Sequence, residues 1–139
     1  MRNWNALATE PQPTYYLPYT EAVTLHILLM RRRGETRFGV FDQALLKSAL
    51  ARPHQAAIYE GADLLRQAAT LCFGLIKNHP WVGGNKRTAT FLVDRFLHRN
   101  GIEALAAVNE TVEMVLAVES DQWGVDEIAE WYRLHTTAI

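Results

Sequence analysis

The chain has 139 residues, of which 49% are hydrophobic and 21% are charged, and its formal net charge at pH 7 is −1. This length and apolar content predict a single folded domain with a hydrophobic core, and the near balance of charge argues against a nucleic-acid-binding protein, which usually presents a basic face. The N-terminal stretch contains no long apolar run, so we expect neither a signal peptide nor a membrane anchor.

The N-terminal part divides into a lead-in and an apolar helix. Residues 1–15 are expected to form an irregular lead-in, since its prolines interrupt any regular helix, and residues 16–139 are expected to form the domain. Apolar residues then occupy most positions from 21 to 32, which predicts a buried helix with Thr20 as its N-cap. His26 lies among these apolar residues and is expected to be a hydrogen-bonded packing residue.

The next segment is predicted to be a short helix followed by an irregular stretch. The helix covers residues 41–50 and is expected to end at Arg52-Pro53, because a residue that precedes proline avoids the helical conformation. Residues 52–63 lack helical periodicity. Within them, residues 55–61 either form a small hairpin or remain a loop.

Two helices with buried faces are predicted in the middle of the chain, on either side of a glycine-containing loop. Apolar residues recur at three- and four-residue spacings over 64–77 and again over 86–100. The single cysteine, Cys72, lies on the apolar face of the first of these helices. It is expected to be a small buried hydrophobe, which suits a reducing compartment.

The C-terminal part continues the helical pattern. Residues 101–108 are predicted to form a turn-rich crossing, and a helix follows over 109–119 with Asn109 as its cap. A last helix is predicted from about residue 125. The whole chain is therefore predicted to be an all-α bundle.

The loop at residues 79–85 has the composition of an anion site. Asn85 is a good N-cap for the helix that follows, and the glycines before it allow backbone N–H groups to approach a ligand closely. Lys86 and Arg87 place two cations at the positive end of the helix dipole, which costs roughly 0.3–1 kcal/mol each unless an anion lies there. A phosphate bound by the N–H groups, the lysine and the arginine would compensate this cost.

His79, at the other end of the loop, would face such a phosphate. An imidazole titrates near neutral pH and can accept a proton from a hydroxyl, so His79 is a candidate general base for transfer chemistry. Taken singly, His79 also fits a histidine at a helix C-terminus, and Lys86-Arg87 also fits a solvated pair. Their combination around one loop favours the site, although the spacing differs from that of a Walker A loop.

This loop resembles the signature of a known family. The sequence His-Pro-Trp-Val-Gly-Gly-Asn-Lys-Arg-Thr-Ala at residues 79–89 resembles the Fic/Doc signature, and the lysine after the asparagine resembles the Doc ("death on curing") branch. The likeness extends from about Tyr16 to His135, and residues 39–53 are similar to the segment that leads into the family's substrate flap. The resemblance implies a Fic-fold helical bundle with a short flap or β-hairpin beside the active-site loop.

The resemblance also implies a role for each loop residue and an activity. His79 would be the catalytic base, and the nucleotide phosphates would be bound by Gly84, Asn85, Lys86 and Arg87. The implied protein is a cytoplasmic toxin, paired with a separate antitoxin chain, that transfers a phosphate from ATP or another nucleoside triphosphate to a Thr or Ser hydroxyl of a translation factor such as elongation factor Tu. Transfer of AMP is the alternative, and neither a nucleic-acid nor a membrane partner is implied.

One loop position departs from the family pattern. Four residues after the histidine the family has Asp or Glu, which binds the Mg²⁺ that bridges the phosphates, and this chain has Gly83. The loop therefore supplies no metal ligand, although Mg²⁺ is expected with the nucleotide, and the acids considered in its place are Asp63, Glu60 and Glu103. A catalytically silent Fic fold that binds a partner or a nucleotide is the third interpretation, in which Gly83→Asp would raise activity sharply if the site were limited by the metal.

Overall fold

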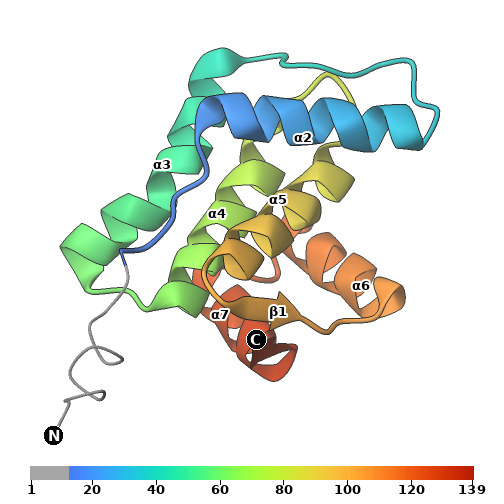
Figure 1. The fold of residues 1–139 in the computed structure, drawn as a ribbon. Helices are drawn as coiled ribbons and strands as arrows, with labels where there is room; N and C mark the ends of the chain where they lie inside the picture. Colours follow the sequence, from blue (N-terminus) through green and yellow to red (C-terminus); the bar gives the residue numbers. More distant parts are fainter. Residues whose placement is uncertain (1–12) are drawn as a thin grey trace, which may run out of the picture.

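The computed structural model describes residues 13–139, so almost all of the expected lead-in over residues 1–15 lies outside the described part (Figure 1). The elements of this part are α2 (Tyr19–Arg32), α3 (Gln43–Glu60), α4 (Leu64–Asn78), α5 (Asn85–Arg99), β1 (Ile102–Ala104), α6 (Val108–Glu119), α7 (Val125–Leu134) and β2 (Thr136–Ala138). The predicted all-α class is confirmed. Over residues 13–139, none of the helices has the length and apolar character that crossing a membrane requires.

The centre of the fold is α4, which lies between α3 and α5 and also packs on α7 (Figure 1). Its Leu71 and Leu75 are fully buried, and burial of such a side chain stabilises the fold by about 1.5–3 kcal/mol. Gly74 permits a close approach of α3, because a Cβ there would lie 3.3 Å from the Cα of Ala49 and 2.7 Å from Arg52 Cδ. The predicted helix over 64–77 is confirmed, and this helix fixes where the next loop begins.

The structure corrects the prediction for α3. The helix does not end at Pro53 but continues to Glu60, so the predicted loop or hairpin over residues 55–61 is wrong. Buried residues recur at three- and four-residue spacings across the proline, at Leu46, Ala49, Pro53 and Ala56. Packing of this face against α4 therefore outweighs the loss of one backbone hydrogen bond at the proline.

The N-caps of two outer helices also differ from the prediction. Pro18, and not Thr20, precedes the first turn of α2. The N-cap residue of α6 is Ala107, two residues before the predicted Asn109, and the helix begins at Val108. There the carboxylate of Glu110 accepts the Ala107 N–H at 2.8 Å, so an acid inside the first turn replaces a polar cap.

A two-stranded antiparallel sheet joins the segment after α5 to the C-terminal residues. Ile102 lies opposite Ala138, and Ala104 lies opposite Thr136. The predicted turn-rich crossing over residues 101–108 thus contains a strand, which is too short, at three residues, for an alternating pattern to be recognised in the sequence. The sheet ties the end of the chain to the end of α5.

Candidate active site

The loop between α4 and α5 turns on two left-handed residues. His79 follows α4 with φ 47° and ψ 57°, and Gly84 precedes α5 with φ 68° and ψ 27°. A positive φ is uncommon for a residue with a side chain and costs about 1–3 kcal/mol, and such strain concentrates at functional sites. The left-handed conformation directs His79 away from the end of α4, and 53% of the His79 side chain is exposed.

Asn85 closes this loop and does not cap the helix that follows. Its Oδ1 accepts the Trp81 N–H at 3.0 Å, and its Nδ2 donates to the Trp81 carbonyl at 2.9 Å. Gly84 is the N-cap residue of α5, and within residues 13–139 no side chain caps this helix. The first backbone bond of the turn runs from Thr88 N–H to Gly84 O. The N–H groups of a helix's first turn form a suitable site for an anion. The prediction of Asn85 as N-cap is wrong.

The irregular segment at residues 37–42, here called the flap segment, runs beside the loop. The Val82 N–H donates to the Gly39 carbonyl at 2.9 Å, and the Phe41 N–H donates to the Pro80 carbonyl at 2.8 Å. A single β-bridge joins Val40 to Trp81. The backbone that pairs with the loop thus comes from the connection before α3, and not from residues 55–61.

The flap segment also fills the space next to Gly83. A Cβ at this glycine would lie 2.7 Å from the backbone carbonyl oxygen of Arg37, closer than real Cβ atoms approach. The position at which the family carries an acid is therefore closed to any side chain unless the flap segment moves. A Cβ at Gly84 would lie 2.5 Å from the end of the Met30 side chain, which would have to shift, and the φ of 68° at Gly84 is itself unfavourable for a residue with a side chain.

The two cations at the start of α5 are paired with carboxylates of other elements. Lys86 Nζ lies 3.1 Å from Glu119 Oε1, and Arg87 Nη1 lies 3.4 Å from Glu35 Oε1. Glu119 also lies near the candidate base, with its Oε2 3.9 Å from His79 Nε2. Exposed pairs of this kind contribute about 0–1 kcal/mol, so an incoming phosphate can displace them.

Glu119 is the acid of this site that the sequence analysis missed. It is the last residue of α6, where the helix dipole disfavours a negative charge, just as Lys86 is disfavoured at the start of α5. Both charges are unfavourable within their own helices and favourable toward each other. An acid at a helix C-terminus was therefore the sequence signal for Glu119. Hydrophobic periodicity does not indicate which residue pairs with this acid.

The acids considered from the sequence lie elsewhere. Asp63 caps α4, where its carboxylate accepts the Arg66 N–H at 2.9 Å, and this bond lowers the pKa of Asp63. Glu60 pairs with the Arg66 side chain at 3.2 Å. Because an α-helix rises about 1.5 Å per residue, this end of α4 lies roughly 22 Å from His79. Glu103 lies in β1, so none of the three takes the place of the missing loop acid.

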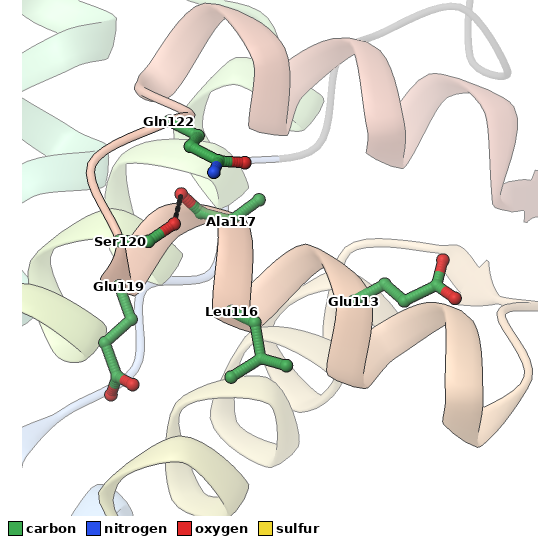
Figure 2. Close-up of a pocket in the computed structure, with 6 residues that line it drawn as sticks. All are labelled: Glu113, Leu116, Ala117, Glu119, Ser120 and Gln122. Carbon is green, nitrogen blue, oxygen red and sulfur yellow. Dashed lines mark hydrogen bonds between the residues drawn. The ribbon is translucent and has the colours of Figure 1, made fainter.

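A shallow depression of about 440 Å³ surrounds the end of α6 (Figure 2). Its lining residues are Glu113, Leu116, Ala117, Glu119, Ser120 and Gln122. Figure 2 shows the Glu119 side chain extending away from Ser120 and Gln122, and its carboxylate pairs with Lys86 of α5. Glu113 points in a different direction from the same helix. Glu119 therefore lines one edge of the depression while its carboxylate reaches the loop site.

A second hollow of about 440 Å³ lies between α5 and α6, directly beside the cations. Its polar rim includes Arg33, Lys86 and Arg87, and its apolar lining includes Val112 and Val115. An apolar pocket with a few polar groups at one end is the usual form of a small-molecule site. The backbone N–H groups at the start of α5, a nearby imidazole and this hollow thus adjoin one another.

A loop of this composition between two core helices, together with the flap segment, defines the class of protein. The chain matches the Fic/DOC family over residues 16–97, which include the whole loop, and it belongs to that family. Over 106 residues it is 39% identical to the protein named "Toxin Doc" of Mycolicibacterium smegmatis, an alignment that covers 69% of this chain and 80% of that relative. The family predicted from the loop sequence is confirmed.

Proposed function

We propose that this protein is a Doc-like toxin that transfers a phosphate from ATP or another nucleoside triphosphate to a Thr or Ser hydroxyl of a cytoplasmic bacterial protein. The observation that carries the proposal is the loop, in which His79 lies across from an uncapped helix N-terminus that bears Lys86 and Arg87. A translation factor such as elongation factor Tu is the proposed substrate, by the family precedent. The 39% identity to a protein named Toxin Doc supports the toxin part of this proposal.

In the proposed mechanism the loop binds the phosphates and His79 moves the proton. Backbone N–H groups at Gly84 and Asn85, with Lys86 and Arg87, hold the phosphate oxygens. His79 Nε2 accepts the proton of the target hydroxyl as its oxygen attacks the terminal phosphorus, and the bond from phosphorus to the leaving nucleoside diphosphate breaks. The exposure of His79 suits this role, since a protein substrate must reach the base.

The hollow between α5 and α6 supports a nucleoside triphosphate as the donor. Lys86 and Arg87 form part of its rim, so a phosphate chain bound to them would direct the nucleoside toward the apolar side chains of Val112 and Val115. Lysine at position 86, where the wider family has a second loop glycine, favours transfer of phosphate over transfer of AMP.

Glu119 is the proposed protein ligand of the magnesium ion that accompanies the nucleotide. Among residues 13–139, no group of three or more His, Cys, Asp or Glu side chains could hold a metal ion without other ligands. Magnesium in nucleotide sites, however, needs only one or two carboxylates together with phosphate oxygens and water. Glu119 supplies one carboxylate between His79 and Lys86, and the ion would neutralise phosphate charge there.

Replacement of Glu119 by glutamine is expected to raise the magnesium concentration that gives half-maximal nucleotide binding, by roughly 10–100-fold. Calorimetric titration of nucleotide at several magnesium concentrations measures this shift. Glu113→Gln is the matched control, since Glu113 lies on the same helix and points elsewhere (Figure 2). If Glu119→Gln instead strengthened nucleotide binding without magnesium, Glu119 would be a competitor of the phosphate and not a metal ligand.

A separate antitoxin chain is the proposed partner. An apolar stripe on α6 supports a covering partner, because Val108, Val112 and Leu116 recur every four residues and are 82%, 50% and 51% exposed.

Expression of the protein alone is expected to slow bacterial growth, and co-expression with the product of the adjacent gene is expected to restore it. Normal growth with folded protein, or arrest by the His79→Ala variant equal to that of the parent, would contradict the toxin proposal.

A further inference from the structure

His26 connects the three segments that build the loop site. It lies fully buried in α2. The Gly39 N–H of the flap segment donates to His26 Nε2 at 3.0 Å, and His26 Nδ1 lies 2.8 Å from the Thr88 hydroxyl of α5. The ring stacks on Trp81 of the loop, with ring centroids 4.0 Å apart and planes inclined by 15°.

These contacts determine the protonation state of the ring. A backbone N–H can only donate, so Nε2 must be unprotonated to accept the bond from Gly39. The proton of the neutral imidazole then lies on Nδ1 and is donated to Thr88. A charged ring would carry a second proton on Nε2, facing the Gly39 N–H, and this bond would be lost.

We propose that His26 is a positioning residue that holds the flap segment against the active-site loop and α5. Through Gly39 it fixes the carbonyl that accepts the Val82 N–H, and through Trp81 it supports the loop that Asn85 closes. The catalytic consequence rests on the proposed function. The attachment of the flap segment does not, because it follows from the contacts alone.

The surroundings of His26 favour the neutral ring. Burial lowers the pKa of His26 from 6.5 to about 4. Among residues 13–139, the groups that contact the ring from the flap segment, the loop and α5 are a backbone amide, an indole and a hydroxyl, and none of these is charged. The unfolded chain therefore binds the proton more readily than the folded one. The free energy of unfolding is expected to fall as the pH is lowered from 6.5 through about 4.

Two variants separate the hydrogen bonds from the stacking. His26→Phe keeps a ring against Trp81 but removes both bonds, and His26→Gln restores an acceptor for the Gly39 N–H. Hydrogen exchange of the Gly39 and Val82 amides, measured by NMR, is expected to become about tenfold faster in His26→Phe, with partial recovery in His26→Gln. The exchange of amides within α4 should change less.

Activity gives the second readout. In His26→Phe, kcat is expected to fall about 10–100-fold with nucleotide affinity nearly unchanged, because the flap segment and the base are no longer held together. The exposed His98, in α5, supplies the matched control as His98→Phe. The ¹⁵N shifts of His26 in the parent protein are expected to show unprotonated Nε2 at pH 6, which needs no variant.

Each outcome separates this proposal from the proposed function. Unchanged exchange at Gly39 in His26→Phe, or a protonated Nε2 in the parent, would overturn the attachment of the flap segment. Faster exchange with unchanged kcat would overturn the positioning role. A parent protein without transfer activity would contradict the proposed function, and the exchange result would still decide whether His26 holds the flap segment.

Discussion

The His79→Ala variant is expected to lose transfer activity by about 10²–10⁴-fold while its nucleotide affinity changes little. The imidazole is the proposed acceptor of the hydroxyl proton, whereas the phosphates are held by the N–H groups of α5 and by Lys86 and Arg87. His79 is half-exposed, so alanine removes no core packing, and a residue with a small side chain still fits after α4. Quantification of modified substrate by mass spectrometry, beside calorimetry of nucleotide binding, measures the two effects separately.

His98→Ala is the matched control for this variant. His98 lies in the last turn of the same α5 helix that begins at the loop, and its side chain is also exposed. Its replacement is expected to leave both activity and nucleotide binding unchanged. Equal activity of the His79→Ala variant and the parent would contradict the assignment of His79 as the base.

Gly83→Asp is expected to lower activity and stability, and not to restore a metal site. The sequence alone suggested that an acid at this position would raise the activity of a metal-limited enzyme. The structure opposes this expectation, because the new Cβ would lie 2.7 Å from the Arg37 carbonyl oxygen. The flap segment would have to move, at a cost of about 1–3 kcal/mol, and its bonds to the loop would weaken. Thermal unfolding and the magnesium dependence of transfer measure both effects.

Two alanine variants test whether steric overlap causes the loss of activity and stability expected in Gly83→Asp. Gly83→Ala introduces the same Cβ without a carboxylate, so a loss equal to that of Gly83→Asp assigns the effect to steric overlap. Gly124→Ala is the tolerated control, since a Cβ there would lie no closer than 3.7 Å to its nearest neighbour, Glu127 Oε1. A sharp gain of activity in Gly83→Asp would contradict the closed position and favour a site that lacks only its acid.

The sequence predicted the part of the fold where periodicity and local chemistry agree. The helices on either side of the loop were predicted to within one residue at each end, because their apolar residues recur at helical spacing, although α4 is buried on nearly every side from Gln67 to Ile76. The candidate site residues His79, Lys86 and Arg87 are close together in the sequence, at the two ends of one loop. Their proximity therefore needed no knowledge of long-range packing, and His26 was correctly predicted to be a hydrogen-bonded packing residue.

Other features depended on contacts between distant segments. Pro53 indicated a helix end, but its burial against α4 kept α3 continuous. Glu119 is forty residues from the candidate base along the chain, and only the packing of α6 brings it to Lys86. The position of the flap segment likewise follows from its hydrogen bonds to the loop. The sequence of such a short segment does not predict these bonds.

The most direct test of the proposed function is peptide mass spectrometry of a bacterial lysate treated with the folded protein, ATP and magnesium, beside the same lysate treated with the His79→Ala variant. A phosphate gained on a threonine or serine in the first sample and absent from the second is the predicted result. A histidine-dependent gain of AMP would contradict phosphate transfer and support the nucleotide transferase alternative. The absence of any histidine-dependent adduct would contradict an active enzyme and favour a silent Fic fold that only binds.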